Sequence, residues 1–233
     1  MAHLFSMVKE LVRPFVPVMV KRHHEMKYWE TKKKTEGELG NDHYEQFYTS
    51  HFGFESSFYK DKVIMDIGCG PRGSLEWAEM ASRRIGLDPL ADKYLELGAD
   101  KHQMEYISSP SENIPLPDSA CDAVFSFNSF DHVDNLHDTA DELKRVTRPG
   151  GFFLLLVEVN HPPTVCEPHG LTPRMILDLL EPEFKPEEVK VFASTVEHDI
   201  YASIKGGVLV EGSPESTSEI GFLSAKFVRQ AIV

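Results

Sequence analysis

The sequence has few cysteines, no long apolar run and no excess of positive charge. Three cysteines in 233 residues, without metal-like spacing, exclude a disulfide framework and favour a reducing compartment, so we expect a cytoplasmic protein. No apolar run reaches the roughly 18 residues that a transmembrane helix needs. The apolar-rich residues 4–20 are interrupted by charges and prolines and lack a signal-peptide cleavage pattern. We therefore expect no stable membrane insertion.

The balance of charge is strongly acidic, with 37 Asp and Glu against 24 Lys and Arg and a net charge of −13. A surface of this sign repels phosphate backbones, so a nucleic-acid substrate is disfavoured unless a local basic patch overrides the field. The candidates for such a patch are Lys21-Arg22 and residues 32–34. We expect no nucleic-acid partner and a small-molecule partner instead.

The chain divides into a polar, aromatic-rich leader (residues 1–60) and a main domain (residues 61–233). Helical spacing of apolar residues predicts one helix in the leader before Pro14 and a second over residues 42–49. The leader's cations permit a membrane-surface helix, but they are few, so a cap on the main domain or a homodimer contact is favoured. The leader aromatics Trp29, Tyr44 and Tyr48 are expected to close over the site or to pack on the sheet.

From Lys62 the pattern alternates between strands and helices, which predicts a mostly parallel sheet covered on both faces. Thr172-Pro173 reads as an N-cap followed by proline at the first helical position. The expected strands are 63–67, 84–87, 104–107, 123–127, 152–159, 189–196 and 221–228; the expected helices include 75–78, 137–147 and 172–180, and residues 206–219 form a loop.

A glycine turn follows the first strand. Gly68, Gly70 and Gly73 satisfy the G-x-G-x-x-G spacing of dinucleotide sites, although a lone match is weak and the glycines also suit a tight turn alone. Asp66 argues against a dinucleotide, because a carboxylate there repels the pyrophosphate that such a turn binds. It suits a cationic ligand such as S-adenosylmethionine, which carries an ammonium and a sulfonium and no phosphate.

Asp88 lies 22 residues after Asp66, at the end of the second strand. An acid about 20 residues downstream in this architecture accepts hydrogen bonds from ribose hydroxyls. Asp66 would bind an ammonium group and Asp88 a ribose, so together they suit a single ligand that is both a cation and a nucleoside.

Five segments, in this order, resemble the class I S-adenosylmethionine-dependent methyltransferase family. They are Val63–Gly70, Gly86–Pro89, Ser111–Asp118, Asp122–Ser126 and Leu143–Gly151. The resemblance implies an α/β, three-layer Rossmann-like methyltransferase fold, with a mostly parallel seven-stranded sheet and a terminal antiparallel hairpin.

The resemblance also implies which residues bind the cofactor, S-adenosylmethionine. Asp66, Gly68 and Gly70 would hold the methionine part, with Cys69 packed against it, and Asp88-Pro89 would meet the ribose. Ser111-Glu112 would flank the adenine, and Asn128 would lie beside the sulfonium. Many relatives carry an acid one or two residues before Glu112, where this chain has Pro110 and Ser111, so the adenine contact falls to the Ser111 hydroxyl or to backbone.

Two loops at the same edge carry the candidate acceptor chemistry. His132 is the first choice for a general base, since its unperturbed pKa suits proton abstraction near neutrality. Asp131 or Asp134 would orient it, and Asp131 and His161 are the further catalytic candidates. A helix cap or a surface position is the alternative for His132. We assign no metal ligand; His161, Glu167 and His169 suit a divalent cation, but a polar pocket wall or lid is favoured for them.

The sequence therefore predicts a methyltransferase that acts on an oxygen or nitrogen atom of a small polar metabolite, with a sugar or glycan precursor among the candidates. A nicotinamide-dependent oxidoreductase is the alternative that the glycine spacing supports. A non-catalytic S-adenosylmethionine-binding partner protein is the alternative that the cationic leader supports.

Overall fold

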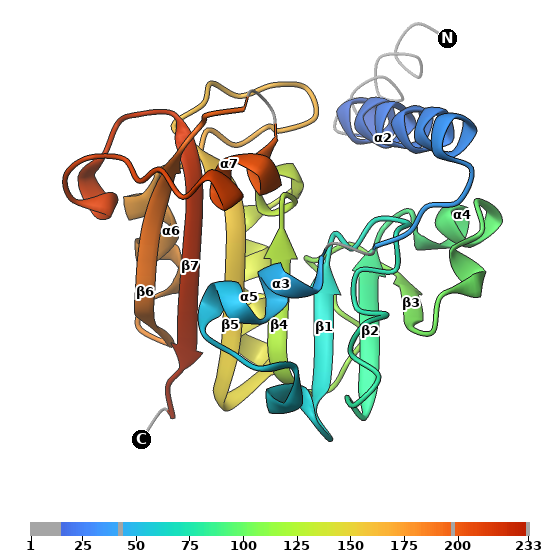
Figure 1. Cartoon of the computed structure of the whole chain (residues 1–233), viewed down its shortest axis with the longest axis horizontal. Helices are drawn as coiled ribbons and strands as arrows, with labels where there is room; N and C mark the ends of the chain where they lie inside the picture. The colour runs from blue at the N-terminus through green and yellow to red at the C-terminus, as the bar shows by residue number, and fades with distance from the viewer. Residues whose placement is uncertain (1–14, 42–43, 197–198, 232–233) are drawn as a thin grey trace, which may run out of the picture.

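The computed structural model describes residues 15–41, 44–196 and 199–231, which form a sheet with helices on both faces (Figure 1). The sheet has seven strands in the order β3-β2-β1-β4-β5-β7-β6. The strands are β1 Val63–Ile67, β2 Arg83–Asp88, β3 Glu105–Ser108, β4 Cys121–Phe127, β5 Thr147–Val159, β6 Phe184–Ala193 and β7 Gly221–Arg229.

The first five strands are parallel, and β7 runs antiparallel between β5 and β6. This arrangement confirms the predicted fold class, including the terminal antiparallel hairpin. The central strands β1 and β4 are almost wholly buried, as expected for parallel strands covered on both faces. The strand predicted over 189–196 instead runs from Phe184 to Ala193. Pro186 lies inside it, at a register shift on an edge strand, where a missing N–H is tolerated.

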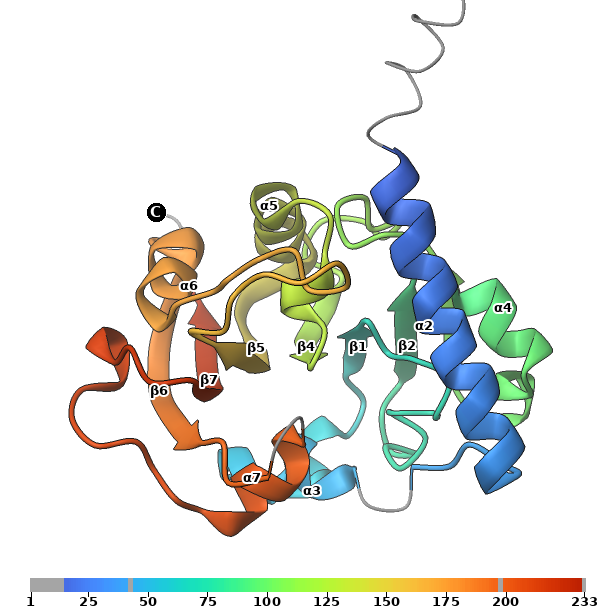
Figure 2. The same ribbon diagram turned by 90° about the horizontal axis from the view of Figure 1, so that it is seen from above.

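Helices cover both faces of the sheet (Figure 2). Helices α5 and α6 pack on one face, while α3, α7 and the turns of residues 50–59 pack on the other. The helices are α2 Phe15–Glu36, α3 Glu45–Tyr48, α4 Ala91–Glu96, α5 Leu136–Val146, α6 Pro173–Leu180 and α7 Ile200–Gly206, with short 3₁₀ turns at Ser50–Phe52, Ser56–Tyr59, Ala99–Lys101, Phe130–His132 and Pro214–Ser216.

Two helix starts follow directly from sequence. Asn135 caps α5 by accepting from the backbone N–H groups of His137 and Asp138, and Thr172 caps α6 by accepting from that of Met175, with Pro173 in the first turn.

No helix in the described part of the chain is long and apolar enough to cross a membrane.

The predicted helix at 75–78 is wrong, because residues 74–77 form turns. Side chains satisfy backbone carbonyls that a helix would otherwise use: Asn41 donates to the carbonyl of Gly73, and Arg84 donates to that of Glu76 at 2.9 Å. Gly73 also has a positive φ of 67°. The segment is thereby held between the leader and β2 without a helix.

The leader differs from its prediction in two ways. The helix predicted before Pro14 lies outside the described residues, and a long helix, α2, follows it. The predicted helix over 42–49 is reduced, within the described residues, to α3. Phe47 and Tyr48 of α3 are buried in the core on this face of the sheet, and the Tyr48 ring contacts Phe125 and Phe127 of β4. Helix α7 was not predicted, since its turn-rich surroundings mask a short apolar face.

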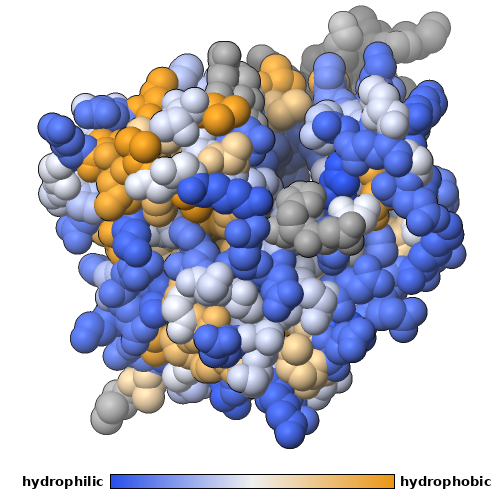
Figure 3. All heavy atoms as spheres, viewed as in Figure 1, coloured by the Kyte–Doolittle hydropathy of each residue, from blue (hydrophilic) through white to orange (hydrophobic). Residues whose placement is uncertain are grey.

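The front face of the molecule is largely hydrophilic, with hydrophobic side chains gathered toward the upper ends of β6 and β7 (Figure 3). Exposed Val208, Leu209 and Ile220 belong to the segments that connect there.

Truncation of a core residue of α5 tests the packing. Leu143 is fully buried, so Leu143→Ala should lower the free energy of unfolding by about 2–5 kcal/mol. Met175 on α6 is 49% exposed, so Met175→Ala should change it by less than about 0.5 kcal/mol. Urea denaturation measures both. Equal losses in the two variants would contradict the assignment of the α5 face to the core.

Candidate active site

A cavity of about 970 Å³ opens at the carboxyl ends of β1, β2 and β4. Seen from above, α2, α7 and the loop of residues 160–172 surround these strand ends (Figure 2). Strand order reverses between β1 and β4, and ligands of open α/β sheets bind in the crevice at such a point. The volume is in the range of small-molecule and cofactor sites.

Asp66 reaches the cavity from the end of β1 and is 3% exposed. Its Oδ2 accepts a hydrogen bond from the Tyr48 hydroxyl at 2.8 Å. Burial raises the pKa of Asp66 to about 7, because a carboxylate loses hydration there, and the bond from Tyr48 opposes this only in part. In the part of the chain that the structure describes, no cationic side chain is hydrogen-bonded to Asp66, so a cationic ligand can take that place.

The glycine turn brings backbone close to its neighbours. Gly68 has a φ of 68°, and a Cβ added there would lie 2.3 Å from the Cβ of Ser129. Gly70 has a φ of 58° and packs under the indole of Trp29 from α2. Only glycine allows both the conformation and the approach at Gly68. Cys69, between them, is buried and lines the cavity, and burial raises its thiol pKa well above its usual value.

Asp88 lies at the end of β2, across the turn from Asp66. Its Oδ1 accepts from the backbone N–H of Leu90 at 2.8 Å, and its Oδ2 faces that of Gly70 at 3.5 Å. Burial raises the pKa of Asp88 to about 7, and the bond from Leu90 opposes this. Asp88 and Pro89 both line the cavity, so the structure brings the two predicted acids to one ligand space.

Ser111, Glu112 and Asn128 also line the cavity. The Ser111 hydroxyl is within 2.9 Å of the Thr139 hydroxyl of α5. The Glu112 carboxylate accepts from the backbone N–H groups of Asp134 and Asn135 at 2.6 and 2.7 Å, so it orders the start of α5. Asn128 has a φ of 55°, and the left-handed turn after β4 places it at the cavity wall.

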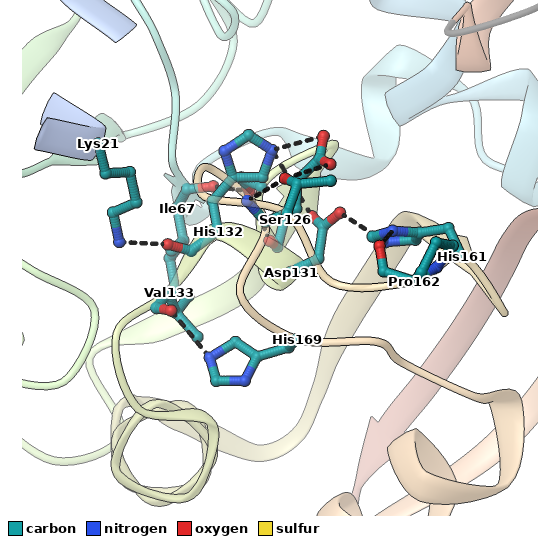
Figure 4. A network of polar contacts seen from close by, with 12 residues as sticks. Lys21, Ile67, Ser126, Asp131, His132, Val133, His161, Pro162 and His169 are labelled. Atoms are coloured by element: carbon teal, nitrogen blue, oxygen red, sulfur yellow. Dashed lines mark hydrogen bonds and ion pairs between the residues drawn. The ribbon is translucent and has the colours of Figure 1, made fainter. Parts of the chain in front are cut away.

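The three predicted catalytic residues lie together at the other side of this opening (Figure 4). Of these three described residues, His132 lines the cavity, whereas Asp131 and His161 do not. The Nε2 of His132 is 3.9 Å from Asp131 Oδ1, and the Nε2 of His161 is 3.5 Å from Asp131 Oδ2. The interaction with Asp131 raises the pKa of His161 to about 9, so His161 is protonated at neutral pH and forms an ion pair with Asp131.

The loop of residues 160–172 contributes Glu167, whose Oε1 is 3.7 Å from His132 Nε2. His169 points elsewhere, with its Nε2 2.9 Å from the carbonyl oxygen of Val133. Among the described residues, the potential metal ligands that come together are therefore Asp131, His132 and Glu167, and the set of His161, Glu167 and His169 considered from sequence does not form.

Several cavity residues were missed by sequence reasoning. Lys21 and Glu25 on α2 line the cavity, and Lys21 binds both the Asp134 carboxylate and the His132 carbonyl oxygen. Glu25 accepts from the Trp29 indole at 2.6 Å. These residues were missed because α2 was not predicted. Lys21, Glu25 and Trp29 fall on one face only when the segment is a helix. Tyr201 on α7 is missed for the same reason.

Comparison with known proteins agrees with this architecture. Residues 65–155 match the family model described as a methyltransferase domain. Malonyl-[acyl-carrier protein] O-methyltransferase from Yersinia pestis is 36% identical over 94 residues, covering 40% of this chain and 35% of that protein. Sterol 4-C-methyltransferase strm-1 from Caenorhabditis elegans is 27% identical over 106 residues, covering 41% and 31%. The chain spans about a third of the length of the curated relatives it matches.

A solved structure extends the likeness to most of the fold. Geranyl diphosphate C-methyltransferase from Streptomyces coelicolor, in complex with Mg²⁺, geranyl diphosphate and S-adenosyl-L-homocysteine, superposes with a TM-score of 0.53 at 19% identity, covering 75% of this chain and 77% of that one. The segment that matches the family model, residues 65–155, includes the glycine turn, Asp88 and β4, which build the cavity described above. Residues 65–155 of this chain therefore resemble a methyltransferase domain, and the solved structure shows the same fold over most of the chain.

Proposed function

We propose that the protein transfers a methyl group from S-adenosylmethionine to an oxygen or nitrogen atom of a small polar metabolite, a sugar or glycan precursor being one class to test. One observation carries the proposal. Two buried carboxylates, Asp66 and Asp88, face a single cavity across a glycine turn. A ligand with one ammonium and one ribose satisfies both, and a dinucleotide places phosphate where Asp66 repels it.

The roles in cofactor binding follow from position. Asp66 binds the α-ammonium, and Gly68 and Gly70 let the backbone approach the methionine part. Asp88 accepts hydrogen bonds from the ribose hydroxyls. Ser111, Glu112 and the backbone near them border the adenine, and Pro89, Cys69 and Asn128 close the surrounding wall. When bound, S-adenosylmethionine supplies an electrophilic methyl group on sulfur.

The leader (residues 1–60) acts in this proposal as a cap on the main domain (residues 61–233). Trp29 packs over Gly70, and Lys21 bonds to the loop that carries His132. A cap of this kind excludes water from a displacement at sulfur and fixes the line of attack on the methyl carbon.

On the acceptor side, His132 is the residue of the predicted trio that meets the cavity, and Asp131 and His161 position it. An oxygen acceptor is supported by the name of the matched O-methyltransferase from Yersinia pestis. The loop of residues 160–172 forms the acceptor-side wall, and loops of this type set substrate choice on a shared fold.

Ligand binding tests the cofactor assignment. S-adenosylhomocysteine should bind the full chain at micromolar concentration in calorimetry, and Asp66→Ala or Asp88→Ala should weaken binding at least 100-fold. Each variant removes a buried charged acceptor. Glu211→Ala, at an exposed position, is the matched control and should bind normally. Absence of heat with S-adenosylhomocysteine, or saturable binding of NADH, would overturn the proposal.

The pH dependence of binding tests the role of Asp66. Its pKa is about 7 in the unliganded protein, and only the ionised form pairs with an ammonium. The affinity for S-adenosylhomocysteine should therefore fall as the pH decreases, by about tenfold between pH 8 and pH 6 for one such group. Titration calorimetry at three pH values measures this. A constant affinity over that range would show that binding does not require ionisation of Asp66.

Substitution of His132 tests the acceptor side. With any acceptor that supports turnover, His132→Asn should lower kcat about 10²–10⁴-fold, the range of a lost proton-transfer contribution, and leave S-adenosylhomocysteine affinity within about threefold. His137→Asn, on the exposed start of α5, is the control. Turnover that survives His132→Asn unchanged would remove His132 from the mechanism.

A further inference from the structure

The loops that follow β4 and β5 place two carboxylates and an imidazole around one small volume beside the cavity. One ligand atom from each of Asp131, His132 and Glu167 lies within 4.8 Å of the others. Asp131 and His132 belong to the 3₁₀ turn after β4, whereas Glu167 comes from the loop of residues 160–172. We propose that this cluster binds a divalent cation of the manganese or zinc class.

A buried, unsatisfied carboxylate oxygen is the independent observation behind this proposal. The Asp131 side chain is 3% exposed, and its Oδ1 is buried without a hydrogen-bond partner among the described residues. A buried polar atom in that state is costly, and an ion is one of the few things that satisfies it. This oxygen is the one 3.9 Å from the Nε2 of His132.

The neighbouring contacts leave the three ligand atoms available. The Oδ2 of Asp131 lies 3.5 Å from the Nε2 of His161, and a neighbour in that position orients a metal-binding carboxylate from behind. The Oε2 of Glu167 accepts a hydrogen bond from the Thr164 hydroxyl at 3.1 Å, and its Oε1 faces His132. The nearby cation Lys21 is already paired with Asp134.

The distances are somewhat long for a bound ion. Ligand atoms about 2.1 Å from a metal lie about 3.0–3.5 Å apart. The separations of His132 from Asp131 and from Glu167, 3.9 and 3.7 Å, must therefore close by roughly 0.2–0.9 Å on binding. The Asp131–Glu167 pair, whose ligand atoms lie within 4.8 Å, must close by up to about 1.8 Å. Glu167, which is partly exposed and sits on a loop, supplies most of that movement by rotation of its side chain. Imidazole with carboxylates suits Mn²⁺ or Zn²⁺ better than the all-oxygen sites of Mg²⁺ and Ca²⁺.

The site deepens the proposed function and rests on it for the choice of acceptor. His132 and Glu167 line the cavity, so an ion there leaves open positions for an acceptor with two adjacent oxygens. A coordinated hydroxyl loses its proton to bulk water more readily than a free one. Its oxygen then forms a bond to the methyl carbon while the carbon–sulfur bond breaks, and sulfur keeps the electron pair as S-adenosylhomocysteine forms. In the cation-bound protein His132 is a ligand, and the acceptor's proton goes to bulk water; without the cation His132 takes that proton, as in the proposed function.

Metal titration of the full chain tests the site without any acceptor. After EDTA treatment and dialysis, Mn²⁺ followed by electron paramagnetic resonance, and Zn²⁺ by calorimetry, should show one site per chain with micromolar affinity. Asp131→Asn, His132→Gln and Glu167→Gln should each weaken binding at least tenfold. His169→Gln and Glu211→Gln should leave it unchanged, and S-adenosylhomocysteine affinity reports whether each variant is folded.

The outcomes separate this inference from the proposed function. Absence of saturable Mn²⁺ and Zn²⁺ binding, or binding that survives all three ligand variants, overturns the cation site even if S-adenosylhomocysteine binds. Loss of binding in His169→Gln shows that the ligand set is wrong. Normal cation binding without S-adenosylhomocysteine binding instead overturns the methyltransferase proposal.

Discussion

The burial of two carboxylates beside one glycine turn is the constraint on which the site depends. Asp66 and Asp88 end neighbouring parallel strands, so the register of β1 and β2 fixes the distance between them. Among the described residues neither carboxylate is hydrogen-bonded to a cationic side chain, and burial raises the pKa of both to about 7. A fold keeps such groups at a cost to its own stability, and a cationic ligand that pairs with one of them recovers that cost on binding. The hydrogen bond from Tyr48 orients Asp66 until then.

The fold, and the meeting of Asp66, Asp88 and the glycine turn at one cavity, were predictable because their signals are local in sequence. The first strand, the glycine turn and Asp88 all lie between residues 63 and 88, and each has a direct physical meaning in a parallel sheet. Errors arose where long-range contacts decide the structure. A helix was expected over residues 75–78, yet this segment forms turns. The side chains of Asn41 and Arg84 donate hydrogen bonds to the backbone carbonyls of Gly73 and Glu76 there. The leader's contribution through Trp29 and Lys21 was hidden because α2 has no clear apolar stripe.

On the acceptor side of the cavity, the sequence predicted which polar residues the loops carry but not which of them come together. Sequence placed His132, His161, Glu167 and His169 in two loops at one edge, and nothing in their spacing tells which side chains converge. The structure pairs His161 with Asp131, turns His169 to the carbonyl of Val133, and leaves His132 between two carboxylates. Loops from different strands meet only in three dimensions, so such groupings are settled by packing and not by motif.

The claim that Asp66 and Asp88 bracket one nucleoside-bearing cation is tested most directly by a crystal structure with S-adenosylhomocysteine. The account predicts that the ligand's ammonium lies within hydrogen-bond distance of the Asp66 carboxylate and its ribose hydroxyls within reach of Asp88, with the sulfur directed toward His132. A ligand seated with its ribose on Asp66, or bound outside the cavity between β1 and β4, would contradict it.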